Sequence, residues 1–317
     1  MDVKRLKAIM VGHAVGDALG VPVEFSSKEA LDADPVVDMR EFGTFGVPKG
    51  TWSDDTSMSL CALEAMDGEK INIDRIMGNF VRWLDNGDFT PDGYAFDVGN
   101  SCYEAIHAYI DGKSWRACGG RSDYSNGNGS LMRIHPFAAF MYDKNVEVER
   151  KIKVVEIGSA LTHAHPRSRM ACGVYAFIMW AILDDPSKDA IRRGIGEAEA
   201  FYTGKGADNA DYARELYKFR RIFDKDFAKL SEEKIKSSGY VIDSLEAAVW
   251  CLLTTDSYAE CVLRAVNFGH DTDTVGAIAG GLAGAMYGYD AIPKAWRETL
   301  VEREYIESLC EKASFVR

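Results

Sequence analysis

Apolar residues recur at intervals of three and four along nearly the whole sequence of 317 residues. This is the spacing of one face of an α-helix, whereas the alternation typical of half-buried strands is scarce. The pattern predicts about ten to thirteen helices and an all-α fold. The clearest helical segments are 3–10, 73–84, 149–162, 170–183, 245–252, 257–265 and 294–312. No tandem repeat and no linker-like stretch divides the chain, so we expect residues 1–317 to form a single domain.

Two segments depart from this pattern. Residues 85–130 are rich in Gly, Asp, Asn and Ser, and we expect irregular loops there around one short helix near 101–111. Long loops in a compact helical protein are often functional. Residues 203–237 are rich in charged side chains, which is typical of a helical excursion whose charges face solvent.

Charge and cysteine content narrow the range of partners and compartments. The sequence has 37 Lys and Arg against 49 Asp and Glu, a formal net charge of −12. This balance disfavours nonspecific binding to nucleic acids or anionic membranes, because both would be repelled. The segment 1–20 carries several charged residues and so lacks the apolar core of a signal peptide. The seven cysteines are odd in number and show no CxxC spacing, so we expect neither a disulfide scaffold nor a zinc–thiolate site. These features predict a cytoplasmic protein that is not bound to a membrane.

Two clusters of carboxylates and hydroxyls each precede a helical segment. Ser53-Asp54-Asp55-Thr56 stands before the apolar stretch 57–66, and Asp271-Thr272-Asp273-Thr274 stands before 275–287. Asp, Ser and Thr are common caps of helix N-termini, so one such cluster alone would be read as a cap. A single carboxylate is enough for capping, however, and a second one adds repulsion that needs another reason.

That reason would be a metal site, if the fold brings the two clusters together. At an effective dielectric constant of about 20, two carboxylates roughly 4 Å apart repel each other by about 4 kcal/mol. Divalent cations would remove this repulsion. The candidate ligands are all oxygens, which favours the hard ions Mg²⁺ and Mn²⁺ over zinc, and their number is sufficient for two ions.

The helical segment 275–287 contains four glycines between Val275 and Met286. Each glycine in a helix costs about 1 kcal/mol relative to alanine. Close approach of a neighbouring backbone would offset this cost, so we expect the segment to be a central helix with tightly packed neighbours.

At this point the motifs of the chain resemble those of the ADP-ribosylglycohydrolase family. This family includes the glycohydrolase that reactivates dinitrogenase reductase and the ADP-ribosyl-acceptor hydrolases. The matching segments follow the family's order along the sequence and span about residues 12–288. They are Gly16-Asp17-Ala18-Leu19-Gly20 with Pro22 and Glu24, Trp52 to Thr56, Phe96-Asp97-Val98-Gly99-Asn100, Gly127 to Arg133 with Pro136, Thr162-His163-Ala164-His165-Pro166, Ser238-Gly239-Tyr240-Val241 with 245–248, and Asp271 to Thr274. Ser53 stands where the family more often has Thr, and His270 where Gly is common.

The resemblance implies a single compact orthogonal helical bundle with a dinuclear Mg²⁺ or Mn²⁺ cleft. It implies a hydrolase that cleaves the glycosidic bond between ADP-ribose and an acceptor, for which we expect arginine in a protein. The partner would be an ADP-ribosylated protein or a small ADP-ribosyl compound, and we expect a monomer or weak oligomer. The two metals would be held by Ser53, Asp54, Asp55, Asp271, Asp273 and Thr274.

The resemblance also implies roles for other residues. Asp54, Asp55 or Glu24 would accept a proton from the attacking water, and Asp97 would orient the ribose or protonate the departing nitrogen. The sequence does not choose among these bases. The remaining candidates would bind substrate, through the ribose, the diphosphate or the adenine: Asn100, Gly127, Asn128, Gly129, His163 and Tyr240.

Simpler interpretations stand beside these. His163 and His165 can cap the loop before Pro166, Arg133 can be structural, and His13 lies on an apolar helix face like a packed core histidine. Two other functions remain open. An HD-type metal phosphohydrolase would use imidazole ligands, and a non-catalytic ADP-ribose-binding relative would bind without turnover.

Overall fold

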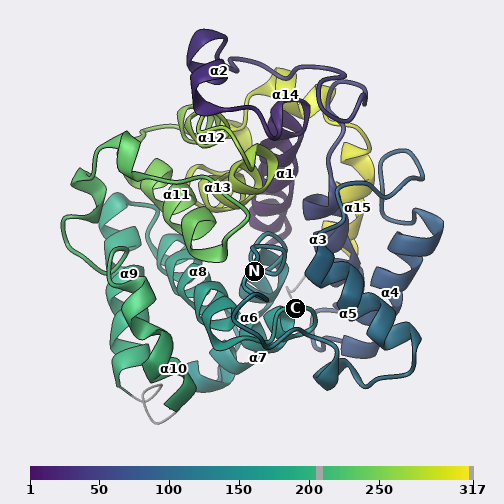
Figure 1. Cartoon of the computed structure of the whole chain (residues 1–317), viewed down its shortest axis with the longest axis vertical. Helices are drawn as coiled ribbons and strands as arrows, with labels where there is room; N and C mark the ends of the chain where they lie inside the picture. Colours follow the sequence, from purple (N-terminus) through teal and green to yellow (C-terminus); the bar gives the residue numbers. More distant parts are fainter. Residues whose placement is uncertain (205–209, 314–317) are drawn as a thin grey trace.

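The computed structural model describes residues 1–204 and 210–313, which form helices joined by loops (Figure 1). Within these ranges, β-pairing is limited to isolated bridges. The all-α prediction is therefore confirmed. The longer helices are α1 (Val3–Gly20), α3 (Asp54–Glu64), α4 (Ile73–Asn86), α5 (Asn100–Ile110), α7 (Val148–Ala160), α8 (Pro166–Asp184), α9 (Lys188–Thr203), α11 (Val241–Thr254), α12 (Tyr258–Val266), α13 (Thr272–Tyr287) and α15 (Arg303–Lys312).

The number of helices in the described ranges, fifteen, exceeds the prediction. The additional ones are short, and a helix of six or seven residues shows too few turns for its periodicity to be recognised. The predicted helix 294–312 is in fact two helices, separated at residues 300–302. The short helices are α2 (Lys28–Ala33), α6 (His135–Met141), α10 (Ala210–Glu215) and α14 (Lys294–Thr299), and 3₁₀ turns are η1 (Val21–Val23), η2 (Trp115–Ala117), η4 (Leu216–Phe219), η5 (Phe227–Lys229), η6 (Glu232–Lys234) and η7 (Tyr289–Ala291).

The glycine-rich helix α13 is central, as predicted, and its closest neighbour is α1 (Figure 1). Glycines of both helices face each other at the contact. A Cβ on Gly280 would lie 2.3 Å from the carbonyl oxygen of Gly12, and one on Gly16 would lie 2.1 Å from that of Gly276. These distances leave no room for a side chain, so the two backbones touch directly.

The other helices cover this pair. α8, α11 and α12 contact α13, and α15 and α3 contact α1. Figure 1 shows α8, α9 and α11 on one side of the central pair and α3, α4 and α15 on the other. His13 of α1 is a packed core histidine, as predicted, because its Nδ1 donates to the carbonyl oxygen of Ala277 at 3.1 Å and its ring lies 4.1 Å from that of His135. Burial lowers the pKa of His13 to about 4.

The segment Val3–Val23 is long and apolar enough to cross a bilayer by length and composition alone. Of the window that meets this test, 94% is buried inside the protein. The apolar composition of Val3–Val23 is therefore explained by the packing of α1 against α13 and the other helices around it.

The two irregular regions differ in how well they were predicted. α5 is the single α-helix in 85–130, as expected. Most charged side chains in residues 210–237 are exposed, as expected, but the segment is not one helical excursion, because α10 is followed by 3₁₀ turns and Phe219 and Phe227 are buried in the core. One charged side chain of this segment binds a buried group, since Nε of Arg221 donates to the buried carboxylate of Glu246 at 2.6 Å. Residues 205–209 lie outside the described ranges.

The α1–α13 contact predicts that a single methyl group at Gly280 destabilises the protein. The Gly280→Ala variant should lower the free energy of unfolding by about 3 kcal/mol or more, because the new Cβ collides with backbone that cannot rotate away. Urea unfolding followed by circular dichroism measures this.

Gly78→Ala is the matched control, because Gly78 lies inside α4 and no atom stands within 4 Å of its added Cβ. It should raise the free energy of unfolding by about 0.5–1 kcal/mol. Equal effects of the two substitutions would contradict the proposed packing constraint.

Candidate active site

The two acidic clusters converge in space, as predicted. Ser53 is the N-cap of α3, and Asp271 is the N-cap of α13. The hydroxyl of Thr274 donates to Oδ2 of Asp55 at 3.3 Å, and the hydroxyl of Ser53 lies 3.3 Å from the same oxygen. Two turns more than two hundred residues apart in sequence thus meet through one carboxylate, and Asp54 and Asp273 are buried beside it.

Asp17 of α1 belongs to this cluster, although the sequence analysis assigned it no role. Its carboxylate accepts hydrogen bonds from the backbone N–H of Ser53 at 2.9 Å, and from the N–H and hydroxyl of Thr56 at 3.0 and 2.6 Å. Asp17 therefore caps the N-terminus of α3 from a different helix. The signal that was missed is a carboxylate inside an otherwise apolar helix, because such a group is rarely buried without partners.

The predicted phosphate loop lies next to Asp271. Nδ2 of Asn128 donates to Oδ2 of Asp271 at 2.7 Å and to the hydroxyl of Ser244 at 2.9 Å. The backbone N–H of Asn128 donates to the carbonyl oxygen of Gly239 at 3.0 Å, and an isolated bridge joins Gly127 to Tyr240. Four of the predicted substrate-binding residues, Gly127, Asn128, Gly129 and Tyr240, are thereby brought to one place.

His163 is also part of this arrangement, and it is fully buried. Its Nδ1 is hydrogen-bonded to the hydroxyl of Thr162 at 2.7 Å, while its ring stands 3.1 Å from the position of a Cβ on Gly129. Burial lowers the pKa of His163 to about 3, so the ring is neutral. Asn100, by contrast, is exposed at the first position of α5, and its side chain makes no hydrogen bond to the described carboxylates.

Two residues have the structural roles that the sequence suggested. Arg133 is fully buried, and its Nη2 donates to the hydroxyl of Thr162 at 2.8 Å and to the carbonyl oxygen of Gly158 at 3.3 Å. His165 is the N-cap of α8, since its Nδ1 accepts from the backbone N–H of Arg167 at 3.2 Å.

The mouth of the site is held by a backbone clasp. The N–H of Phe25 donates to the carbonyl oxygen of His270 at 2.7 Å, and the N–H of His270 donates to that of Ser26 at 2.7 Å. Phe25 and His270 both have left-handed backbones, with φ of 63° and 61°. Such conformations are unfavourable for residues other than glycine and persist where the surrounding structure imposes them. The clasp fixes Glu24 beside the start of α13.

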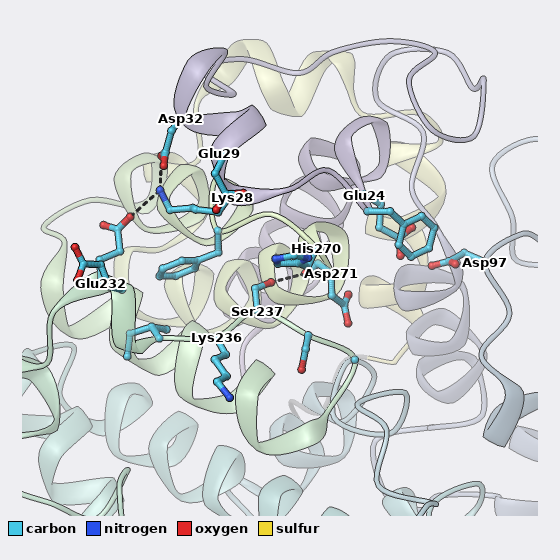
Figure 2. Close-up of a pocket in the computed structure, with 16 residues that line it drawn as sticks. Glu24, Lys28, Glu29, Asp32, Asp97, Glu232, Lys236, Ser237, His270 and Asp271 are labelled. Atoms are coloured by element: carbon cyan, nitrogen blue, oxygen red, sulfur yellow. Dashed lines mark hydrogen bonds and ion pairs between the residues drawn. The ribbon is translucent and has the colours of Figure 1, made fainter.

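Glu24 closes the carboxylate group. One carboxylate oxygen each of Glu24, Asp271 and Asp273 lies within 4.8 Å of the others. Asp97, also left-handed with φ of 56°, interacts with Glu24 through their carboxyl groups. Both line a cavity of about 1160 Å³, which Asp271 and His270 line as well (Figure 2).

Burial dominates the electrostatics of this group. It raises the pKa of Asp54, Asp55 and Asp273 well above the usual range, and neighbouring carboxylates add to the rise. Burial and the Asp97 carboxylate raise the pKa of Glu24 to about 9. The pKa of Asp97 rises to about 7 and that of Asp17 to about 6, again chiefly through burial. Ionised together, these groups need a cation.

The residues present fit hard divalent cations. Oδ1 of Asp55, Oδ2 of Asp273 and Oε2 of Glu24 are buried and have no hydrogen-bond partner in the part of the chain that the structure describes. Such orphaned acceptors are costly in a protein interior unless something binds them. The atoms available as metal ligands are carboxylate and hydroxyl oxygens, which suit Mg²⁺ or Mn²⁺. The group of Glu24, Asp271 and Asp273 contains no imidazole.

The raised pKa values predict how the metal-free protein responds to pH. Glu24 and Asp97 hold protons in the folded state at a pH where the unfolded chain has released them. The unfolded state therefore binds fewer protons, and the free energy of unfolding falls as the pH rises from about 6.5 to 8. Thermal unfolding in EDTA measures this fall.

Glu24→Gln should reduce the fall, and Mn²⁺ or Mg²⁺ should abolish it in the unaltered protein by binding the ionised carboxylates. A melting temperature in EDTA that stays level or rises across this range would contradict the electrostatics of the site.

Asp17 generates a second prediction. The Asp17→Asn variant should lower the free energy of unfolding by about 1–3 kcal/mol, because an amide NH₂ group would face donors that now bind a carboxylate oxygen. Asp2→Asn is the control. Asp2 lies at the surface, where its carboxylate accepts from the backbone N–H of Arg5 and caps α1, and asparagine caps a helix equally well. Similar melting temperatures of the two variants would refute the capping role of Asp17.

The chain was compared with known proteins. The family model for ADP-ribosylglycohydrolase matches residues 2–317. ADP-ribosylarginine hydrolase Tri1 of Serratia proteamaculans (strain 568) is 32% identical over 315 residues, which cover 98% of this chain and 79% of the relative. The ADP-ribosyl-dinitrogen reductase glycohydrolase of Rhodospirillum rubrum is 29% identical, covering 95% of this chain and 92% of its own length.

A solved structure described as an ADP-ribosylglycohydrolase-related protein complex has the same fold. It superposes with a TM-score of 0.79 at 29% sequence identity, covering 98% of this chain and 97% of that one. With a family model and relatives that align over nearly its full length, this protein belongs to the ADP-ribosylglycohydrolase family and is a glycohydrolase.

Proposed function

We propose that the protein removes ADP-ribose from arginine side chains of proteins, with two Mg²⁺ or Mn²⁺ ions as cofactors. The observation that carries this proposal is the set of buried, unpartnered carboxylate oxygens of Glu24, Asp55 and Asp273, of which Glu24 lines a large cavity. Without bound cations a cluster of this kind stays partly protonated at neutral pH, and cations allow its carboxylates to ionise together.

The ligands that we propose are Ser53, Asp54, Asp55, Asp271, Asp273 and Thr274. When bound, divalent cations at this place supply positive charge that orients the ribose hydroxyls and makes a water molecule more acidic. Asn128 and Asp17 then act as positioning residues. Asn128 orients the carboxylate of Asp271, and Asp17 holds the first turn of α3, which carries Asp54 and Asp55.

Carboxylates of the chain accept and donate the protons of the reaction. One of Glu24, Asp54 and Asp55 accepts a proton from the water that attacks C1″ of the ribose. Asp97, whose carboxyl group lies beside those of Glu24 and Asp273, orients the ribose or donates a proton to the departing nitrogen of the acceptor. The negative charge around C1″ favours a transition state with oxocarbenium character.

The ADP portion is bound on the side of the loop 127–129. Backbone N–H groups of Gly127 and Gly129 and the neutral ring of His163 are suitable donors for a diphosphate. Tyr240, half-buried beside Gly127, offers an aromatic face to the adenine. We assign Asn100 to the ribose side, since it lies three residues beyond Asp97.

Two relatives support arginine as the acceptor. The Serratia proteamaculans protein and a Pseudomonas putida protein, 32% and 30% identical to this chain, are both named ADP-ribosylarginine hydrolase Tri1. The Rhodospirillum rubrum relative is named for a protein substrate, dinitrogen reductase, which favours an ADP-ribosylated protein over a free metabolite.

The alternatives have less support. An HD-type phosphohydrolase needs imidazole ligands, and the carboxylate group of Glu24, Asp271 and Asp273 contains none. A non-catalytic ADP-ribose-binding protein would not need buried proton acceptors in addition to a complete set of oxygen ligands.

We extend the proposal to the setting of the enzyme. Residues 1–317 act as one domain, because the buried apolar residues form one hydrophobic cluster. The seven cysteines are all free thiols, which suits a reducing cytoplasm. We propose a monomer or weak oligomer that works away from membranes and bulk nucleic acid.

The direct test is release of ADP-ribose from a peptide that carries ADP-ribosylarginine. The Asp271→Ala variant should lose about 10²–10³-fold in kcat or more, because it removes a proposed cation ligand. EDTA should abolish turnover in the unaltered enzyme, and Mg²⁺ or Mn²⁺ should restore it. Calorimetric titration should find two Mn²⁺ per chain, and fewer in the variant.

The control is Asp226→Ala, which removes an exposed aspartate that pairs only with Lys229. It should keep normal turnover. Near-normal turnover of Asp271→Ala would disprove the metal mechanism, and binding of ADP-ribose with zero turnover under all metal conditions would establish the non-catalytic alternative.

A further inference from the structure

The outer part of the cavity is bordered by carboxylates that the proposed chemistry does not use. They come from two separate elements, α2 and the turn η6, which face each other across the opening (Figure 2). All four are exposed. We call this group the acidic wall, and it consists of Glu29, Asp32, Glu232 and Glu233.

The negative charge of the acidic wall is only partly compensated. Nζ of Lys28 is 3.3 Å from the carboxylate of Glu232 and also pairs with Asp32, so it links the two sides of the wall (Figure 2). Lys236 is the only other lysine among the residues that line the cavity, against seven carboxylates. Glu29, whose carboxylate accepts from the hydroxyl of Ser27, and Glu233 form no ion pair among the described residues, so their negative charge is available to a substrate.

The loop that contacts Asp271 has a different character. Asn128 of the loop 127–129 bonds to Asp271, and His163 and Tyr240 lie beside the same loop. His163 offers a neutral hydrogen-bond donor, and Tyr240 offers an aromatic face. A diphosphate carries negative charge and would be repelled by the acidic wall, whereas the neutral loop suits it. Charge thus assigns the ADP portion to the loop and the acceptor portion to the acidic wall.

Phe25 lies on the acceptor side, between Glu24 and the acidic wall. Its side chain is 68% exposed although it lines the cavity, and its left-handed backbone is imposed by the clasp to His270. Its ring is 6.3 Å from that of Phe45. An exposed aromatic face beside carboxylates is a good contact for a guanidinium group, which stacks on rings and pairs with carboxylates.

Glu24 also points to a ligand in this cavity. The residue is only 5% exposed, and its Oε2 is buried without a partner at the inner end of this cavity. The cavity therefore contains an unsatisfied acceptor at its base, an aromatic face above it and carboxylates at its rim. All three favour a positively charged occupant.

We propose that the acidic wall selects ADP-ribosylated proteins whose modified residue is flanked by lysine or arginine. This inference depends on the proposed function, because it concerns the acceptor side of the same site. Glu29 and Glu233 are the specificity-determining residues, and Phe25 is the contact for the acceptor guanidinium.

Two peptides with the same central ADP-ribosylarginine test this inference, one with lysines and one with glutamates on both sides. The enzyme should show a kcat/KM at least about tenfold higher for the basic peptide at low salt. The preference should shrink at about 0.5 M NaCl, because exposed charges are then screened. The double variant Glu29→Lys/Glu233→Lys should lose or reverse the preference.

Asp85→Lys/Glu304→Lys is the matched control, because it makes the same change of charge at exposed positions of α4 and α15. It should keep the preference of the unaltered enzyme. Turnover of free ADP-ribosylarginine and inhibition by ADP-ribose should also be unchanged in this control variant. Phe25→Leu, which keeps an apolar side chain on the same backbone, should raise KM for arginine-linked substrates.

Equal kcat/KM for the two peptides, or a preference that survives Glu29→Lys/Glu233→Lys, would overturn the inference while leaving the proposed function intact. If neither peptide released ADP-ribose with Mg²⁺ or Mn²⁺, the proposed function would be wrong. Binding of the same two peptides, measured by fluorescence anisotropy, would then test whether the acidic wall prefers basic sequences. Tighter binding of the basic peptide would support it, and equal binding would overturn it.

Discussion

The direct contact between the backbones of α1 and α13 determines where every other part of the site lies. Glycines at intervals of four on both helices allow it, and at its end Gly20 lies against the start of α13. A Cβ on Gly20 would be 2.3 Å from the backbone nitrogen of Asp273, and the hydroxyl of Thr272 donates to the carbonyl oxygen of Gly20 at 2.8 Å. The chain then turns through η1 to Glu24, which is thereby held beside the acidic N-terminus of α13.

Asp17 extends this arrangement to a third helix. It stands on α1 next to Gly16, and its carboxylate holds the first turn of α3 through the N–H groups of Ser53 and Thr56. Three helices that are far apart in sequence are thus joined by a glycine contact and one buried carboxylate. The first turns of α3 and α13 carry Asp54, Asp55 and Asp273, so their acidic groups cannot move apart to relieve repulsion.

The site combines buried charge with strained backbone, which is the usual sign that local stability has been given up for function. Phe25, Asp97 and His270 all adopt left-handed conformations around the mouth. The carboxylates behind them stay compatible with folding through protonation or through cations. The site also separates charge in space, with carboxylates near Glu29 and neutral donors in the loop 127–129, which bonds to Gly239 of the cavity wall. One cavity can therefore orient a substrate that is anionic at one end and cationic at the other.

Sequence patterns alone determined the all-α fold, most of the long helices, the two acidic helix N-termini and the close approach that four glycines in 275–287 require. These are local properties, because helical periodicity, capping and glycine cost depend on residues near each other in the chain. The sequence also suggested that the two acidic turns meet, but only through family resemblance and a conditional argument about repulsion. The short helices, the turns of 210–237, the capping role of Asp17 and the acidic wall were decided by tertiary structure. Each depends on contacts between segments far apart in sequence, and no local pattern reports which distant backbone will supply a donor or a neighbouring charge.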